Sequence, residues 1–181
     1  NIYPQDINGA IAEGLKASEG MKGWDVVVAN LSDPEQGLPD ELLNRADVLV
    51  WWGHKKHGEV KDALVDKIER RVKEEGMGFI ALHSAHFAKP NKRLMGTACS
   101  FSAYKSDTSE TVVRVAQADH PLAKGVKAEF SVANDERYSD PYVVPPTEQV
   151  PFVGVQVHKN GTREEAKLGY CWNVGKARFF Y

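Results

Sequence analysis

The sequence of 181 residues has few cysteines, no long apolar run and almost no excess of charge. Its two cysteines, Cys99 and Cys171, are too few for a disulfide scaffold or a metal centre of four thiolates. We therefore expect both to be buried thiols. The longest uninterrupted apolar run is five residues, Val48 to Trp52, whereas a membrane-spanning helix needs about twenty. We predict that no segment crosses a membrane.

The charge balance also limits the classes of partner. The chain has 23 Lys and Arg against 25 Asp and Glu, a formal net charge of −2, so it has no cationic surplus with which to hold a polyanion. We therefore do not expect a nucleic acid partner. The apolar share of 42% and charged share of 27% are typical of an ordinary globular chain, and we predict one domain over 1–181, truncated at both ends. We expect a cytoplasmic location, and the sequence leaves the oligomeric state open.

The first half of the chain alternates short apolar runs with amphipathic segments. Periodicity predicts helices over 6–18, 41–46 and 60–75, and strands over 25–29, 47–52 and 79–82. Strands that are apolar along their whole length and alternate with helices are typical of a parallel sheet covered on both faces. We therefore predict an α/β fold with an open, doubly wound, mostly parallel sheet.

The second half is β-rich. The apolar pattern predicts strands over 111–116, 128–132, 150–157, 167–172 and 177–181. One helical turn is expected over 121–126, and the proline-rich segment 141–151 is expected to be a loop.

Four of the six histidines follow two of the predicted strands. His54 and His57 come after the strand at 47–52, and His83 and His86 come after the strand at 79–82. Ligands of open α/β sheets bind beyond the carboxyl ends of the strands, and residues at i and i+3 of a helical turn lie about 5 to 6 Å apart. We predict that the two pairs converge on a functional site, although capping or backbone hydrogen bonds would explain any single histidine. The cofactor stays open. A divalent metal held by these four side chains is the weaker interpretation, because the H-x-x-H pattern lacks the glutamate of the H-E-x-x-H zinc motif.

Ser84 and the tandem tryptophans lie beside these histidines. Ser84 occupies a strand-to-helix turn, but a nucleophile there needs small residues two positions away on each side, and those positions hold Leu82 and His86. We therefore interpret Ser84 as a helix cap or a substrate hydrogen-bond donor. Trp52 and Trp51 are suited to stacking on a sugar ring, and at least one of them is expected in the core.

An acidic segment at 135–140 supplies further candidates. Glu136 is a candidate general acid or base for sugar hydroxyls. Tyr138 and Tyr142 are candidates for stacking on a pyranose face. The alternative is an ordinary polar loop.

Several blocks of sequence resemble the ThuA-like (trehalose utilisation) family. The resemblance is continuous over residues 3–100 and is strongest at 50–60, 76–87 and 94–97; it is weaker at 135–142. It implies a flavodoxin-like fold of the class I glutamine amidotransferase-like type, and a role in the use of trehalose and related disaccharides. Relatives also carry a further strand before these blocks and an R-P-G-H-E motif after them, which this chain lacks.

The resemblance also implies a chemistry. The substrate would be a disaccharide or its 3-keto form, which a partner sugar dehydrogenase produces. A neutral histidine would remove the proton next to the carbonyl, with His54, His57, His83 and His86 sharing the duties of base and enolate binding and Glu136 protonating the leaving oxygen. Glutamine hydrolysis is not expected, because the turn that needs a cysteine nucleophile carries none.

Two other classes of function stay open at this point. In a non-catalytic sugar-binding or accessory module, the histidines and Trp52 would only hydrogen-bond and stack on the sugar. In a metal-dependent hydrolase, the four histidines would hold the metal ion.

Overall fold

A computed structural model describes residue 3 and residues 6–181. The chain divides into two compact units, Asn1–Ala46 and Asp47–Tyr181. All the residues that sequence reasoning singles out for function lie in the second unit.

The first unit is helical in its regular parts. Its elements are α1 (Ile7–Ala17), the 3₁₀ turns η1 (Glu19–Met21) and η2 (Pro34–Gly37), and α2 (Asp40–Arg45). The helices predicted over 6–18 and 41–46 are thus confirmed to within one residue at each end. The α1 helix begins where its sequence provides an N-cap, since the Asp6 carboxylate accepts a hydrogen bond from the Gly9 N–H.

The strand predicted over 25–29 is wrong. Residues 24–30 have no regular secondary structure and join no sheet of the described chain. Val27 and Val28 are 48% and 40% exposed, and the segment is held by side-chain contacts, such as Arg45 Nη1 to Asp25 Oδ2 at 2.9 Å and Asn8 Nδ2 to the Ala29 carbonyl oxygen at 3.3 Å. Branched side chains favour an extended backbone, but a strand also needs the backbone groups of a partner.

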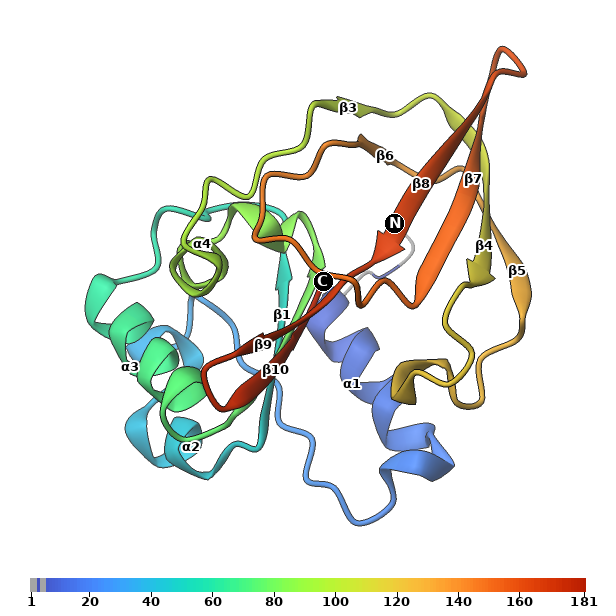
Figure 1. Cartoon of the computed structure of the whole chain (residues 1–181). Helices are drawn as coiled ribbons and strands as arrows, with labels where there is room; N and C mark the ends of the chain where they lie inside the picture. Colours follow the sequence, from blue (N-terminus) through green and yellow to red (C-terminus); the bar gives the residue numbers. More distant parts are fainter. Residues whose placement is uncertain (1–2, 4–5) are drawn as a thin grey trace. The chain divides into compact units, whose positions relative to one another are not determined.

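The second unit contains a mixed four-stranded sheet. Its strands are β1 (Val48–Gly53), β2 (Gly78–His83), β9 (Cys171–Val174) and β10 (Ala177–Phe180), in the order β1-β2-β10-β9. β1 and β10 both pair with β2 in parallel, and β9 pairs with β10 antiparallel. The predicted parallel pairing of the first two strands is therefore confirmed, and the sheet as a whole is mixed (Figure 1).

Two helices lie against each other beside this sheet. α3 (Asp62–Lys73) connects β1 to β2, and α4 (Lys89–Met95) follows β2 after the 3₁₀ turn η3 (Ser84–Phe87) (Figure 1). The apolar stripe of α3 is buried as its spacing predicts. The buried side chains of this stripe are Leu64, Val65, Ile68 and Val72.

The remaining strands form an antiparallel sheet and a short ladder. The sheet comprises β4 (Thr108–Val115), β5 (Glu129–Ala133), β7 (Phe152–His158) and β8 (Arg163–Gly169), in the order β5-β4-β7-β8, with β7 and β8 as a long hairpin (Figure 1). The ladder pairs β3 (Ala103–Lys105) with β6 (Arg137–Ser139), and η4 (Pro121–Ala123) is the expected helical turn. The strand predicted over 167–172 is two strands, because the chain leaves β8 at Tyr170 before β9 begins.

The core of the second unit is built on rings from neighbouring parallel strands. Phe79 in β2 and Phe179 in β10 are each 1% exposed, and their rings stack with centroids 5.1 Å apart. Both cysteines are buried free thiols, as expected. The protein is therefore a mixed α/β structure in which β1, β2 and β10 run parallel from a packed core.

Candidate active site

Two of the four predicted histidines meet at the carboxyl ends of β1 and β2. Gly53 pairs with His83 at the last position of the parallel ladder, so the residue that follows Gly53 lies next to His83. The Nδ1 atom of His54 is 3.0 Å from the Nε2 atom of His83, which is a hydrogen-bond distance. We call His54 and His83 the histidine pair.

The indole ring of Trp52 lies against the histidine pair. Its ring centroid is 5.5 Å from that of His83, with the planes 9° apart, and 5.9 Å from that of His54, with the planes 21° apart. The two imidazoles also stack on each other at 5.2 Å. The neighbouring Trp51 packs on Phe79 instead. Both tryptophans are only half-buried, so the expectation that one of them belongs to the core is wrong, and Trp52 supports the two imidazoles.

His83 has an unusual backbone conformation. Its φ is 58° and its ψ is −131°, a region that a residue with a Cβ rarely adopts and that carries a strain of about 1 to 3 kcal/mol. The residues two positions before and after it are Ala81 and Ala85, which are 1% and 0% exposed. A sharp strand-to-helix turn needs small residues at those two positions. The special position of this turn is therefore His83 and not Ser84.

The end of β1 is packed closely against the start of η3. A Cβ atom on Gly53 would lie 2.9 Å from the Cα atom of Ala85 and 3.2 Å from the Cε1 atom of His57. No side chain fits at Gly53, so the end of β1 approaches the start of η3 closely enough for the histidine pair to meet. His57 is thereby held against the backbone behind the pair.

A tyrosine from the end of β10 fastens the strained turn. The Tyr181 hydroxyl donates a hydrogen bond to the carbonyl oxygen of His83 at 3.0 Å and lies 2.7 Å from Nδ1 of His86. A hydroxyl has one proton, and because that proton goes to the carbonyl, Nδ1 of His86 must donate to the Tyr181 oxygen. His86 is therefore the Nδ1–H tautomer.

His86 faces the interior. It is 0% exposed, and its Nε2 atom has no hydrogen-bond partner in the described part of the chain. Aromatic rings surround it, and burial lowers the pKa of its imidazole to about 4. The rings within 6.2 Å of its centroid are those of Phe87, Phe101, Tyr138, Tyr142 and Tyr181. In this conformation His86 supports the turn from behind and does not reach the surface.

Glu136 lies beside the histidine pair although it is 53 residues distant from His83 in sequence. Its Oε2 atom is 3.7 Å from Nδ1 of His83, and its Oε1 atom accepts a hydrogen bond from the Tyr104 hydroxyl at 2.9 Å. The next residue, Arg137, is buried and donates to Asp107, to Ser139 and, at 2.7 Å, to Glu164. The ladder of β3 and β6 thus holds Glu136 in place.

Ser84 and Tyr138 form a hydrogen bond with each other. The Ser84 Oγ and Tyr138 hydroxyl oxygens are 2.8 Å apart, and Ser84 is 8% exposed. Ser84 does not cap η3, whose N-cap is His83. The Tyr138 ring is half-buried between Tyr104 and Phe101, with centroids 5.2 and 5.3 Å away.

Burial shapes the protonation of the site. Desolvation lowers the pKa of His83, opposed by the charge of Glu136, and it also lowers the pKa of His57. Both imidazoles are therefore neutral near pH 7. A neutral imidazole has a lone pair that accepts a proton.

The same geometry limits what the site offers to a metal. Among residues 3 and 6–181, no group of three or more His, Cys, Asp or Glu side chains is arranged to hold a metal ion. The histidine pair alone would supply two nitrogen ligands, fewer than the three or four of most zinc sites.

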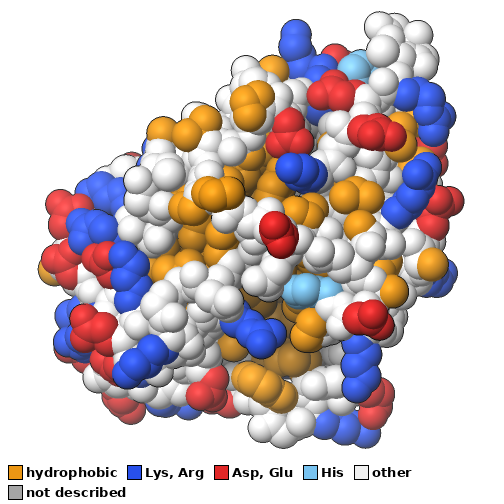
Figure 2. Space-filling model, in the orientation of Figure 1, with side chains coloured by type: hydrophobic (Ala, Val, Ile, Leu, Met, Phe, Trp, Pro, Cys, Tyr) orange, Lys and Arg blue, Asp and Glu red, His pale blue; other side chains and the backbone are white. Residues whose placement is uncertain are grey.

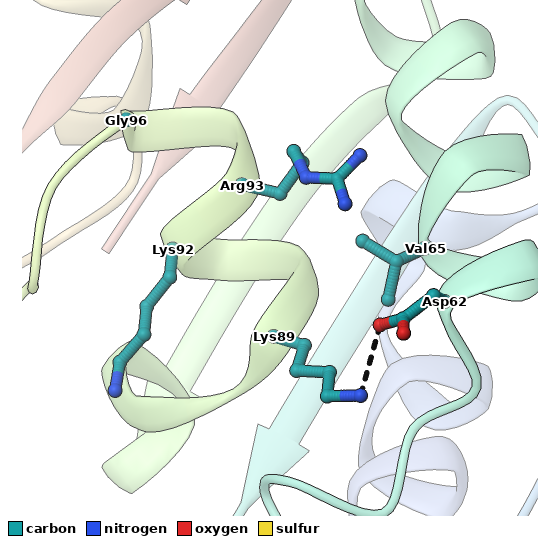
Figure 3. A pocket seen from close by; sticks show the side chains of 6 residues that line it. All are labelled: Asp62, Val65, Lys89, Lys92, Arg93 and Gly96. Carbon is teal, nitrogen blue, oxygen red and sulfur yellow. Dashed lines mark hydrogen bonds and ion pairs between the residues drawn. The ribbon is translucent and has the colours of Figure 1, made fainter.

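A shallow groove of about 370 Å³ lies between α3 and α4. Figure 3 shows Lys89, Lys92 and Arg93 along α4, with Lys89 bonded to Asp62 at 2.9 Å. Arg93 is paired with Asp66, and acidic and basic side chains are interspersed over α3 in Figure 2. The cations of this groove are therefore largely neutralised.

Sequence reasoning missed two residues of the site. Tyr104 lies in a short mixed strand with no periodic signal, and Tyr181 appears only as one of several aromatic residues in the last strand. The spacing in the sequence marks His83 as a candidate site residue but does not by itself assign it a strained backbone. The signal for that was present, because Ala81 and Ala85 flank His83 symmetrically.

Comparisons with known proteins identify a family and two similar structures. The family model described as "ThuA: Trehalose utilisation" matches residues 5–181. A putative thua-like protein from Parabacteroides merdae ATCC 43184 has a similar structure, with a TM-score of 0.63 and 16% identity over 95% of this chain and 71% of that one. A second, from Bacteroides uniformis ATCC 8492, has a TM-score of 0.52 and 18% identity over 82% of this chain and 64% of that one. No curated protein matches the chain.

The helices of the described residues are also too short or too polar to cross a bilayer.

Proposed function

Because this chain belongs to the ThuA trehalose utilisation family, we propose that it is an enzyme of carbohydrate use that removes the proton next to the carbonyl of a 3-keto disaccharide. Membership of the family supports a sugar as the substrate, and the geometry of the candidate active site supports proton abstraction as the reaction. The observation that carries the proposal is the contact of His54 with His83, which in turn faces Glu136.

The proposed reaction requires a base that is neutral at the pH of the cell. A ketone at C3 of the sugar acidifies the C2–H bond, so that an imidazole can take the proton while the electron pair remains on the sugar as an enolate. The enolate then re-forms the ketone at C3, its C2=C3 electron pair becomes a C1=C2 double bond, and the bond from C1 to the glycosidic oxygen breaks with its electron pair on that oxygen. The imidazolium formed in the first step can return its proton to that leaving oxygen, so atoms and charges balance within the site.

We assign Glu136 the role of orienting His83. Its carboxylate accepts from Tyr104 and faces the ring nitrogen of His83, the arrangement by which a carboxylate sets the orientation of a catalytic imidazole. Direct protonation of the leaving oxygen by Glu136 stays a prediction. For Ser84 and Tyr138 we propose a role in lining the ligand site through their mutual hydrogen bond, and for His57 and His86 a role in positioning the pair.

The experiment follows hydrogen at C2 of the sugar. Purified protein is incubated with 3-keto-trehalose in D₂O, and the loss of the C2 proton signal is followed by ¹H NMR, so that proton abstraction is detected even without bond cleavage. The variant His83→Asn is used because asparagine tolerates positive φ better than most residues. We expect exchange that is slower by about 100-fold or more, because the variant breaks the contact between the two imidazoles on which general-base catalysis by the histidine pair depends.

A matched histidine outside the site provides the control. His120 caps η4 through its Nδ1 atom, and His120→Gln should exchange the C2 proton at the wild-type rate. Wild-type protein that exchanges the C2 proton no faster than buffer would refute the proposed reaction.

One observation favours a sugar-binding module as the second candidate. Tyr104 is 51% exposed and lies next to Tyr138 and Glu136, so an aromatic face and a carboxylate are both accessible to a sugar. Binding of trehalose or of its keto form by calorimetry, with no exchange at C2, would favour the module over the enzyme.

Other parts of the hypothesis go beyond the family and are proposed with it. They are a doubly wound, flavodoxin-like strand order, a single domain, a cytoplasmic location and a sugar dehydrogenase that supplies the ketone. A bound divalent metal is the remaining alternative, and stoichiometric zinc or manganese in elemental analysis of active protein would favour a metal-dependent hydrolase.

A further inference from the structure

The histidine pair and Glu136 form a chain of contacts in which each group donates its proton towards the next, in the order His54, His83, Glu136. We infer that the nitrogen that accepts the substrate proton is Nε2 of His54, and that His83 is a positioning residue that connects His54 to Glu136. This inference rests on the proposed function for the identity of the substrate, whereas the arrangement of protons within the chain of contacts does not.

The direction begins at Glu136. An ionised carboxylate can only accept hydrogen bonds, and the Tyr104 hydroxyl already donates to its Oε1 atom at 2.9 Å. The other oxygen, Oε2, is 3.7 Å from Nδ1 of His83. A negative charge at that position favours the tautomer of His83 in which Nδ1 carries the proton.

The proton on Nδ1 determines the state of the opposite nitrogen. In neutral His83 the Nε2 atom then has a lone pair and accepts. The group 3.0 Å from it is Nδ1 of His54, which must therefore be the donor. With its proton on Nδ1, neutral His54 has its lone pair on Nε2.

Exposure leads to the same nitrogen. One ring nitrogen of His83 contacts His54 at 3.0 Å and the other faces the Glu136 carboxylate at 3.7 Å, and the His83 side chain is only 27% exposed. His54 is exposed, and its Nε2 atom makes no hydrogen bond within residues 3 and 6–181. A substrate can therefore meet a vacant lone pair on His54 and none on His83.

The surroundings also suit the charge that the reaction creates. When the C2–H bond breaks, its electron pair stays on the sugar and the new N–H bond forms at Nε2 of His54, which becomes an imidazolium. The Nδ1–H of His54 still donates to His83, whose own Nδ1–H is directed at the carboxylate, so the cation is stabilised through His83. The indole of Trp52 stacks on both imidazoles and adds a cation–π contribution.

The test measures tautomers directly. Protein labelled with ¹⁵N-histidine is examined by long-range ¹H–¹⁵N NMR, which distinguishes protonated from bare ring nitrogens, and signals are assigned by single substitutions. We expect neutral His54 and His83 both to carry the proton on Nδ1. A wild-type spectrum with the proton of His54 on Nε2 would overturn the inference, whatever the protein does to a sugar.

Glu136→Gln reverses the direction in a predictable way. Tyr104 donates to the Oε1 position and so holds the amide oxygen there, which leaves the amide NH₂ facing Nδ1 of His83. That nitrogen must then accept, the His83 proton moves to Nε2, and the proton of His54 moves to Nε2. Unchanged tautomers in this variant would show that Glu136 does not set the direction.

The neighbouring carboxylate provides the matched control. The charge of Asp135 also acts on His83, but less strongly than that of Glu136. Asp135 accepts from the Glu136 N–H through Oδ1, and Asp135→Asn keeps that acceptor, so both tautomers should stay as in the wild type.

Measuring C2 exchange in the same variants distinguishes a failure of the base assignment from a failure of the proposed function. Glu136→Gln and His54→Gln should each slow exchange on the order of 100-fold or more, and Asp135→Asn should not. Exchange that survives in His54→Gln but is lost in His83→Asn would overturn the assignment of the base. Predicted tautomers in a wild-type protein that exchanges nothing would refute the proposed function and leave the arrangement of protons intact.

Discussion

The buried imidazole of His86 makes a quantitative prediction about stability. Burial lowers its pKa from 6.5 to about 4, whereas the unfolded chain keeps the ordinary value. A lowered native pKa means that the unfolded state binds a proton first as pH falls. The stabilising effect is therefore complete above pH 6.5 and is lost progressively as the pH falls towards 4.

The magnitude follows from the size of the shift. Each pKa unit corresponds to 1.36 kcal/mol, so the full loss is about 3 kcal/mol, and at pH 5 about 2 kcal/mol of it has been lost. A backbone hydrogen bond to His83 partly opposes the effect of burial, whereas the charge of Lys92, and those of His57 and His83 once they are protonated, lower the pKa of His86 further. The tyrosines packed on it do not ionise in this range, because burial raises the pKa values of Tyr138, Tyr142 and Tyr181.

The assay compares two proteins at two pH values. Urea unfolding of wild type and of His86→Asn is followed by circular dichroism at pH 7.5 and pH 5. Asparagine keeps an N–H near the position of Nδ1, so that Tyr181 retains a donor, but it does not titrate. The variant loses packing at both pH values, whereas the difference between the two proteins should shrink by about 2 kcal/mol at pH 5. A pH dependence that is the same in both proteins would refute the reasoning.

Two further predictions concern the backbone of the turns. Gly175 has φ of 59°, and a Cβ there would lie 2.3 Å from the carbonyl oxygen of Lys73, so Gly175→Ala should lower the unfolding free energy by about 2 kcal/mol or more. Gly161→Ala, with φ of 86° and nothing within 4 Å, is the control and should lose about 1 kcal/mol in the same denaturation experiment. Tyr181→Phe removes the donor to the His83 carbonyl and should lower the unfolding free energy by about 1 to 3 kcal/mol while also slowing C2 exchange. If Tyr181→Phe exchanges the C2 proton at the wild-type rate, the hydrogen bond from Tyr181 is not needed for the function of the turn.

The strands and helices that periodicity predicts are those whose partners are also strongly patterned. The apolar stripe of α3 and the apolar run of β2 each have a buried partner in the sheet or the helix layer, so local pattern and packing agree. The segment at 25–29 has an equally strong pattern and no partner in the described chain. Sequence records the tendency of a segment to extend, whereas a ladder depends on what lies beside it.

The sequence singles out the histidines and Glu136 of the candidate site, but not Tyr104 or Tyr181, and it does not predict the geometry of the site. The i, i+3 spacing predicts that the two histidines of each H-x-x-H sequence share a helical turn, and this prediction is wrong. His54 and His57 lie in bends and turns, and His83 has a non-helical φ, so the helical spacing does not apply. Instead, one histidine from each loop meets the other, because the parallel register places Gly53 opposite His83.

The approach of Glu136 had no local signal at all. Its position depends on the three-residue ladder of β3 and β6 and on Arg137, whose guanidinium bonds to Asp107 and Glu164. These contacts join residues about thirty positions apart. No periodicity predicts such contacts, because polar side chains at one position in sequence can pair with many others.

The strain at His83 connects the fold to the proposed chemistry. A positive φ of this kind persists only where the surroundings enforce it, and here the small residues Ala81 and Ala85 allow the sharp turn while Tyr181 fastens its carbonyl. A relaxed turn would rotate the His83 ring away from either His54 or Glu136, since the two partners lie at opposite nitrogens of one rigid imidazole. The strained conformation is therefore the one in which both contacts exist at once. The buried residues around the turn enforce that conformation, and so they connect the packing of the fold to the proposed chemistry.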